Sequence, residues 1–445
     1  MIVRISRISH EVAKSQFVKN FSIVMSGTGL AQVVLFALAP VITRLFSPHD
    51  FGILGSFNAV LAFIAAGVTF QYSEALMLPK KDSDAANVFA VSVIFAIMIT
   101  LAGIVVVSVF SNKFLSILNA TEKPFLLWLL PIGVFLNGMN QSFQAWCIRR
   151  KDFVSTSLSQ IIRAITGSIS QVGLGILRTG ATGLIGGVLL GDGLASINLV
   201  YRIFRKDASQ IQQALSWTKI RLVAKEYRDF PIYSSTQNML TAFSFGLPIF
   251  FLSYFYGLPV AGAYAFGLRV LQAPINLFLT PIRQVLFQKA SESYNLSLNV
   301  TELFKKATLG LFFFSFTPFA VMFLYIPNIF FWVFGEEWFE AGIYAKWLIL
   351  WQAFVFCNVP AVLFAKIFRQ QRKLFLFDVF LLIIRVSVLS VGGLYLNAIN
   401  TIILFSISGM LMNLALICWI WLLLKKTRSL KFLGIGTDEM AVRGN

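Results

Sequence analysis

The sequence predicts an all-α polytopic membrane protein with twelve transmembrane helices in two halves of six. Three observations predict this fold class: the apolar composition, the number of long apolar runs and the placement of Lys and Arg. Of the 445 residues, 57% are hydrophobic and 13% are charged, and the mean hydropathy is +0.78. A soluble domain is about 45–50% apolar and about 25% charged, so lipid must be the solvent for most of this chain.

Twelve apolar runs are each long enough to cross a bilayer core of about 30 Å. We place these spans at 21–43, 53–78, 86–110, 125–148, 153–177, 181–203, 231–256, 260–287, 307–330, 341–367, 374–396 and 400–424. The neighbouring spans 153–177 and 181–203 are rich in Gly, Ser and Thr, which favours close packing of the two helices.

The basic residues fall on one side of this topology. Of the 37 Lys and Arg residues, 29 lie on the side that carries both termini, five lie on the other side and three lie within spans. Cytoplasmic loops carry such an excess, so both termini are predicted to be cytoplasmic. The net charge of +18 therefore reflects topology rather than nucleic-acid binding, because no basic segment sits on a soluble domain.

A polar stretch between spans six and seven divides the chain. We predict an N-terminal six-helix lobe at 1–203, a cytoplasmic linker helix at 204–230, a C-terminal six-helix lobe at 231–424 and a cytoplasmic tail at 425–445. Pro40 and Pro248 lie in the outer part of the first helix of each half. Because proline removes a backbone hydrogen bond, both positions are predicted hinges. Six-helix repeats with matching interrupted helices are typical of transporters.

Four ionisable residues lie deep inside predicted spans: Arg163, Asp192, Arg269 and Arg385. Each is about 14–17 Å from a membrane surface, where a charge costs at least about 2.5–3.5 kcal/mol and normally faces a bundle interior or a watery cavity. The surplus of arginine favours an anionic ligand, since the planar guanidinium binds phosphate through two hydrogen bonds. A structural pair between Arg163 and Asp192 is equally open.

Residues suited to metal binding or catalysis are scarce. Cys147, Cys357 and Cys418 lie in or beside apolar runs, and His10 and His49 are the two histidines. No CxxC is present, so no metal site, cofactor or catalytic residue is predicted, and the protein is not expected to be an enzyme.

Three groups of residues between positions 40 and 342 carry a family resemblance. The first comprises Pro40, Arg44-Leu45-Phe46-Ser47-Pro48 and Asp50-Phe51-Gly52-Ile53. The second comprises Phe230-Pro231-Ile232-Tyr233-Ser234-Ser235, Leu247-Pro248-Ile249, Leu252-Ser253-Tyr254-Phe255-Tyr256-Gly257, Ala261-Gly262-Ala263-Tyr264, Leu268-Arg269-Val270-Leu271 and Pro274. The third comprises Phe334-Gly335-Glu336-Glu337-Trp338 and Ala341-Gly342. Together they resemble bacterial polysaccharide transporters, the O-antigen flippase-like branch of the multidrug/oligosaccharidyl-lipid/polysaccharide exporter superfamily.

The resemblance implies two six-helix lobes around a central cavity in the bacterial inner (cytoplasmic) membrane. It implies a flippase of O-antigen, lipopolysaccharide or other surface-polysaccharide biosynthesis, whose substrate is an oligosaccharide joined by pyrophosphate to undecaprenyl. Membrane lipids and other polysaccharide assembly proteins are the further expected partners. Arg44 and Arg269 lie in matching motifs and are expected to bind substrate, whereas Arg163, Arg385 and Asp192 rest on depth alone. Coupling to H+ or Na+ stays open.

Other functions compete with this one. A multidrug exporter of the same superfamily would favour cationic drugs and an acidic lumen. A major-facilitator transporter would carry a Gly-x-x-x-Asp-Arg loop after span two, where this chain has Pro79-Lys80-Lys81-Asp82-Ser83-Asp84. A membrane polysaccharide polymerase or ligase would need a long outer loop, and the outer loops here are short. A lipid II flippase would have fourteen spans, and the twelve predicted here count against that function.

Overall fold

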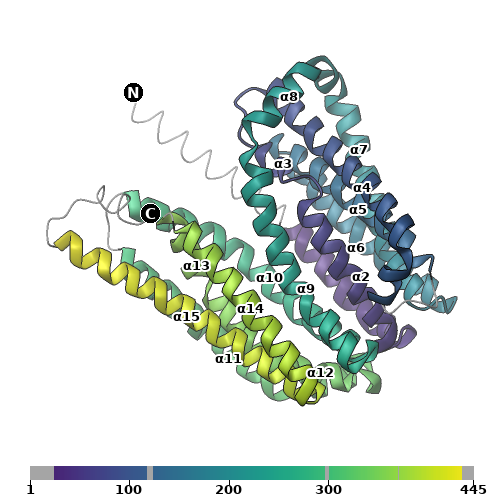
Figure 1. The fold of residues 1–445 in the computed structure, drawn as a ribbon, viewed down its shortest axis with the longest axis vertical. Coiled ribbons are helices and arrows are strands. Elements are labelled where there is room, and N and C mark those ends of the chain that lie inside the picture. Colours follow the sequence, from purple (N-terminus) through teal and green to yellow (C-terminus); the bar gives the residue numbers. More distant parts are fainter. Residues whose placement is uncertain (1–24, 118–123, 296–299, 369, 433–445) are drawn as a thin grey trace. The chain divides into compact units, whose positions relative to one another are not determined.

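The computed structural model describes residues 25–117, 124–295, 300–368 and 370–432, and within these ranges the chain forms helices without a β-strand (Figure 1). The elements of the first half are a helix at Met25–Leu45, α2 (Pro48–Gly67), α3 (Tyr72–Ala75), α4 (Asp82–Ile117), α5 (Leu126–Arg149), α6 (Phe153–Ile176) and α7 (Ala181–Ala214). The remaining elements are α8 (Trp217–Glu226), a π-helix η1 (Phe230–Ser235), α9 (Thr236–Tyr256), α10 (Leu258–Asn295), α11 (Val300–Phe334), a 3-10 helix η2 (Glu336–Trp338), α12 (Phe339–Cys357), α13 (Val359–Ile367), α14 (Gln371–Tyr395) and α15 (Ala398–Phe432).

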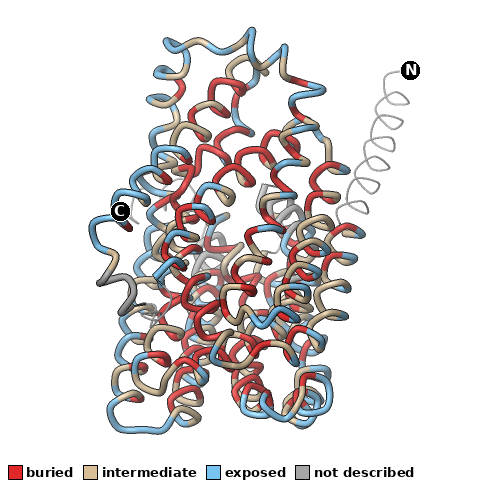
Figure 2. The backbone as a smooth tube through the Cα atoms, turned by 90° about the vertical axis from the view of Figure 1, so that its right-hand side faces the viewer, coloured by how far each residue is buried: buried red, intermediate tan, exposed pale blue. Residues whose placement is uncertain are grey.

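Each predicted span coincides with one or two of these helices, which confirms the all-α membrane fold class. Among the described residues, nine helical stretches are long and apolar enough to cross a membrane. The other three predicted spans coincide with α5, α6 and α10, which fall outside that set. Figure 2 shows buried, intermediate and exposed residues alternating along the helices, with further exposed residues at the turns. The count of twelve crossings remains a prediction.

The second span is not one continuous helix, contrary to the prediction for 53–78. Helix α2 ends at Gly67, and Phe70 and Gln71 adopt left-handed backbone angles with φ of 46° and 60°. The Gln71 side chain donates to the carbonyl oxygen of Ala66 at 2.7 Å and so stabilises the break. Since L-residues visit this conformation at a cost of about 1–2 kcal/mol, the break depends on the packing around it.

Part of the first motif group, from Ser47 to Asp50, caps the start of helix α2. Ser47 is the N-cap of α2: its hydroxyl accepts from the backbone N–H of Asp50, and the Asp50 carboxylate accepts from the backbone N–H of Ser47. This is a capping box, and Pro48 occupies a helix position where no backbone donor is needed. The motif therefore fixes the start of α2.

The described residues divide into two compact units. Unit 1 comprises Met1–Ala265 and Val333–Trp338, and unit 2 comprises Phe266–Trp332 and Phe339–Asn445. The boundary falls inside α10 rather than in the 204–230 stretch, because α9 packs along α2 within unit 1. The division into lobes at 1–203 and 231–424 remains a prediction.

The 204–230 stretch contains more than the single linker helix that we predicted. Helix α7 runs on to Ala214, and α8 then folds back against α4. The Asn87 side chain holds the turn between them, donating to the carbonyl oxygen of Ala214 at 2.9 Å and accepting from the backbone N–H of Ser216 at 3.1 Å. Tyr72 donates to the carbonyl oxygen of Ala224 at 2.7 Å. The stretch is therefore docked on unit 1.

A close helix crossing in unit 1 depends on two motif glycines. A Cβ atom on Gly262 would overlap the carbonyl oxygen of Pro48 and lie 2.6 Å from the backbone nitrogen of Gly52, and one on Gly52 would overlap the carbonyl oxygen of Leu258. Small residues let helix backbones approach in this way. The starts of α2 and α10 are thus in backbone contact.

Trp338 is buried in unit 1 and packs against Phe51 of α2, near this crossing. Its ring is 1% exposed, its Nε1 donates to the carbonyl oxygen of Thr43 at 3.0 Å, and it meets the Phe51 ring edge-on at 4.8 Å. The Thr43 hydroxyl donates to the carbonyl oxygen of Phe334 at 3.2 Å. A short segment from far along the chain is therefore part of the core of unit 1.

Candidate functional site

Arg163 and Asp192 form an ion pair within unit 1. Nε of Arg163 lies 2.6 Å from Oδ1 of Asp192, and their side chains are 41% and 8% exposed. Helices α6 and α7 approach closely, because a Cβ on Gly191 would lie only 2.7 Å from the carbonyl oxygen of Arg163. The pairing that the sequence left open is therefore present, and the close packing predicted from the small residues of these helices is confirmed.

A line of amide side chains on α5 lies beside this pair, and charge and depth alone did not predict it. Asn140 donates to the Ser196 hydroxyl at 2.9 Å and to the carbonyl oxygen of Asp192 at 3.4 Å. Gln144 donates to the Asn140 side chain at 2.9 Å, and Gln141 donates to the Asn137 side chain at 2.9 Å. The spacing of these four amides, at i, i+3, i+4 and i+7, places them on one helix face.

Three of the four α5 amides are open to a ligand. Asn137, Gln141 and Gln144 are half-buried rather than enclosed. On α6, Gln160 accepts a hydrogen bond from the Thr28 hydroxyl at 2.8 Å. Amide groups both donate and accept hydrogen bonds, as sugar hydroxyls do. The surface can therefore exchange hydrogen bonds with a polar, uncharged ligand, and the spacing of Asn and Gln in the sequence was the signal for it.

Arg269 and Arg44 are the exposed arginines among the predicted site residues. Arg269 lies eleven residues from the start of α10, about 17 Å along the helix axis. Among the described residues it has no carboxylate partner. Arg44 lies at the end of the first helix. Neither is occupied by an ion pair within the described part of the chain, so both guanidinium groups are available to an anion.

Arg385 differs from the expectation of an open substrate ligand. Its side chain is 3% exposed and lies over the rings of Trp351 at 5.4 Å and Phe405 at 5.8 Å. Such cation–π contacts stabilise a desolvated guanidinium. Three helices of unit 2, α12, α14 and α15, supply these residues. Arg385 is thus enclosed by aromatic rings within the core of unit 2.

The predicted site residues are distributed over both units. Pro40, Arg44, Arg163, Asp192 and Pro248 belong to unit 1, whereas Arg269 and Arg385 belong to unit 2. Pro248 is buried inside α9, and Pro40 is half-buried inside the first helix. Both helices continue through their prolines, and the hinge role remains a prediction.

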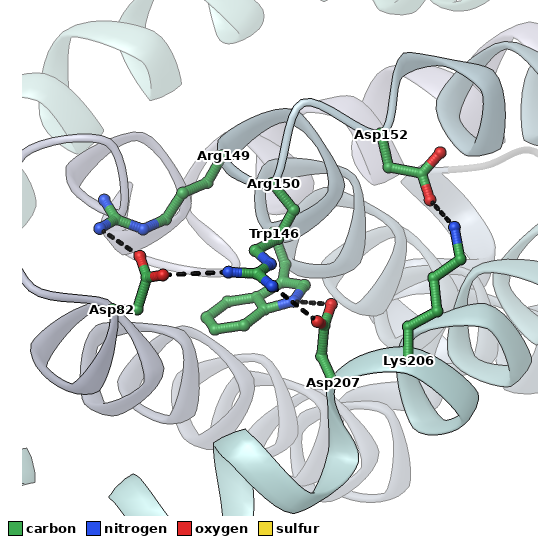
Figure 3. A network of polar contacts seen from close by, with 7 residues as sticks. All are labelled: Asp82, Trp146, Arg149, Arg150, Asp152, Lys206 and Asp207. Atoms are coloured by element: carbon green, nitrogen blue, oxygen red, sulfur yellow. Dashed lines mark hydrogen bonds and ion pairs between the residues drawn. The ribbon is translucent and has the colours of Figure 1, made fainter.

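An ionic network lies at the end of unit 1 where α4 begins and α5 ends, and we call this end the basic end. Asp82 accepts from Arg149 and from Arg150, each at 3.0 Å. Asp207 lies 3.2 Å from Arg150 and accepts from Trp146 Nε1 at 3.0 Å. Figure 3 shows these contacts, with Lys206 paired to Asp152 beside them. The network ties α4, α5 and α7 together.

Asp152 lies in the turn between α5 and α6, outside the membrane-spanning segments. Its carboxylate accepts from the backbone N–H of Ser155 at 3.1 Å and from Lys206 at 2.8 Å. Burial acts to raise the pKa of Asp152, but the hydrogen bonds from Lys206 and Ser155 outweigh it and hold this pKa below its usual range. The charged carboxylate is thus the form that stabilises the start of α6.

Replacing Asp152 with alanine is expected to destabilise the protein by about 1 kcal/mol, the usual cost of losing an N-cap. The stabilisation is complete above about pH 4 and is lost as pH falls through the lowered pKa. Melting temperatures of wild type and Asp152→Ala at pH 7 and at acid pH measure both effects. Asp229→Ala is the control, since Asp229 makes no side-chain cap hydrogen bond. Equal stability of Asp152→Ala and wild type at pH 7 would contradict this account.

Helices that suit a bilayer, with charged and amide side chains held between them, define the class as a multi-pass membrane protein. The chain belongs to the polysaccharide biosynthesis protein family, whose model matches residues 41–342. The match spans the three motif groups except Pro40 and confirms the resemblance seen in the sequence.

A curated relative is also a transport protein of polysaccharide biosynthesis. The succinoglycan biosynthesis transport protein ExoT of Rhizobium meliloti (strain 1021) is 22% identical over 283 residues, which are 60% of this chain and 54% of that protein. The chain therefore matches about half the length of that relative.

Solved transporter structures share the fold. An inward-facing multidrug resistance MATE family transporter of the MOP superfamily has a TM-score of 0.71 at 16% identity, covering 89% of this chain and 95% of that one. The lipid II flippase MurJ in an inward closed conformation has a TM-score of 0.69 at 14% identity, covering 94% of each chain. At these identities the likeness concerns the fold.

Proposed function

We propose that this protein flips an undecaprenyl-pyrophosphate-linked oligosaccharide, the unit of O-antigen or another surface polysaccharide, across the bacterial inner membrane by alternating access. The membership in a polysaccharide biosynthesis family and the fold shared with transporters support a flippase. The exposed Arg269, about 17 Å along α10 and without a carboxylate partner among the described residues, is the observation that carries the choice of an anionic substrate.

The chemistry of such a substrate fits the described residues. A pyrophosphate needs cationic partners before it can leave water, and a guanidinium supplies a planar pair of donors. The half-buried amides of α5 supply partners for sugar hydroxyls. We assign Arg269 of unit 2 to the pyrophosphate and Arg44 of unit 1 to a separate substrate contact. We assign Arg163 with Asp192 to the polar path and to coupling with H+ or Na+, and the enclosed Arg385 to positioning within unit 2.

The orientation follows from the basic residues. The basic end of unit 1 carries Arg149, Arg150 and Lys151 in one turn. We infer that this end and both termini face the cytoplasm, because cytoplasmic segments carry the excess of Lys and Arg. The glycine crossing of α2 and α10 then lies toward the outer leaflet.

Replacing Arg269 tests the function. We expect Arg269→Ala and Arg269→Glu to abolish export of lipid-linked glycan, and Arg269→Lys to keep partial activity because it retains the charge but loses the planar donors. Export is measured as glycan exposed on the outer face, normalised to the amount of folded protein. Arg372→Ala, an exposed arginine at the start of α14, is the control.

Full export by Arg269→Ala at a normal protein level would remove Arg269 from the mechanism. Loss of folded protein in the Ala and Lys variants, with unchanged turnover per molecule, would assign Arg269 a structural role. Export of cationic drugs with no glycan export by wild type would instead favour a multidrug exporter.

A further inference from the structure

A polar pocket of about 440 Å³ lies at the basic end of unit 1. The α5–α6 turn forms one wall, and one face of α7 forms the other. The lining residues are Cys147, Arg150, Lys151, Asp152, Arg202, Ile203, Lys206 and Asp207. The volume is within the range of about 300–1,000 Å³ that ligand sites occupy.

The two acidic residues of the pocket are already neutralised by neighbours. Asp207 is bound by Arg150 and by the Trp146 indole, and Asp152 is bound by Lys206 and the start of α6. Four cations line the pocket against these two anions, so the surplus is positive. Lys151 and Arg202 carry that surplus.

Arg202 is held in place without being neutralised. Its Nη1 donates to the Ser155 hydroxyl at 3.1 Å, in the first turn of α6. No carboxylate pairs with it among the described residues. A guanidinium held by one neutral hydrogen bond keeps its other donors for an anion.

Lys151 occupies a backbone position that normally selects glycine. Helix α5 ends in a Schellman motif, with the N–H of Asp152 donating to the carbonyl oxygen of Cys147 at 2.8 Å and the N–H of Lys151 donating to that of Ile148 at 2.9 Å. The residue at this position is left-handed, and Lys151 has a φ of 56°. Glycine would adopt this conformation without strain, and the lysine that stands here instead places its side chain on the pocket wall.

We propose that this pocket binds the phosphate of an anionic phospholipid headgroup, such as phosphatidylglycerol. Lys151 and Arg202 would contact the phosphate oxygens, and Ile203 and Cys147 form the apolar part of the lining. The assignment to the cytoplasmic leaflet rests on the proposed orientation, whereas the binding chemistry is independent of the transported substrate. Basic pockets between helices on the cytoplasmic side of a membrane are suited to anionic lipid headgroups.

Lipid retention by the purified full-length protein tests the pocket. The protein is exchanged into phosphatidylcholine nanodiscs, titrated with phosphatidylglycerol and analysed by native mass spectrometry. We expect one saturable phosphatidylglycerol site in wild type, and an affinity lower by roughly tenfold or more in Lys151→Gly and in Arg202→Gln, since each removes a charge-assisted hydrogen bond. Lys225→Gln, which removes an exposed cation of α8 outside the pocket, should bind as wild type does.

The Lys151→Gly variant separates binding from folding. Glycine suits the left-handed backbone, so this variant should melt no lower than wild type while it loses the lipid. Unchanged affinity in both Lys151→Gly and Arg202→Gln would overturn the proposal.

Competition identifies the source of the phosphate. Inorganic phosphate at millimolar concentration should not displace phosphatidylglycerol, and displacement would make this a site for soluble anions. Tighter binding of undecaprenyl pyrophosphate than of phosphatidylglycerol would overturn the phospholipid assignment in favour of a lipid-linked substrate. Failure of the Arg269 experiment would leave the lipid titration unaffected, so the two proposals fail separately.

Discussion

Replacing Gly262 with valine is expected to abolish accumulation of folded protein. The new side chain would overlap backbone atoms of Pro48 and Gly52, and backbone atoms cannot rotate away as the end of a side chain can. Overpacking of a core typically costs about 1–3 kcal/mol, and here the clash is with two residues of another helix. Gly52→Val should fail in the same way, because its Cβ meets the Leu258 carbonyl oxygen.

Two other glycines provide the control. Gly103 in α4 and Gly173 in α6 have open space where a Cβ atom would stand, with no neighbouring atom within 4 Å of it, so Gly103→Ala and Gly173→Ala should accumulate normally. Fluorescence-detected size-exclusion chromatography of tagged protein measures the folded amount. A monodisperse Gly262→Val protein at the wild-type level would show that the α2–α10 crossing is not required.

The second large effect is expected on the stability of the protein when Arg163 is removed. Arg163→Ala leaves the buried Asp192 carboxylate without its partner. Breaking a fully buried pair from one side costs about 3–5 kcal/mol, and because the Arg163 side chain is 41% exposed we expect a loss below that range. Asp192→Asn should cost less, since the Arg163 side chain is 41% exposed and is therefore less desolvated than the Asp192 carboxylate. The double variant should recover most of the loss, because neither charge then remains.

Melting temperatures of the four proteins form a double-mutant cycle for this pair. An additive cycle, in which Arg163→Ala and Asp192→Asn act independently, would contradict a stabilising ion pair. Transport assays of the double variant then report whether the pair also serves in coupling.

Much of the fold was predictable because lipid imposes simple rules. Apolar runs of bilayer length predicted the positions of the helices. The alternation across the membrane that the placement of Lys and Arg indicates stays a prediction. The break after Gly67 was not predictable, because Phe70 and Gln71 have no intrinsic preference for left-handed angles. The unit boundary inside α10 was also hidden, since it depends on which helices pack together.

The candidate site was predictable only in part. Depth along the helices identified Arg163 and Asp192, but their contact required knowledge of how α6 faces α7. The enclosure of Arg385 could not be foreseen, because Trp351 and Phe405 come from two other helices. The amides of α5 carry no charge, so their depth in a predicted span did not distinguish them as it distinguished the arginines.

The placement of Val333–Trp338 in unit 1 limits how the protein can be divided. A gene cut within 204–230 would give a first fragment without α9 and without the Trp338 ring that fills its core. Such a fragment would expose the surface around Thr43 and Phe51 until the second fragment arrived. The two halves of this chain are therefore not interchangeable modules: biogenesis of unit 1 finishes only after the ribosome has passed residue 338, and recombination at the midpoint would separate residues that must fold together.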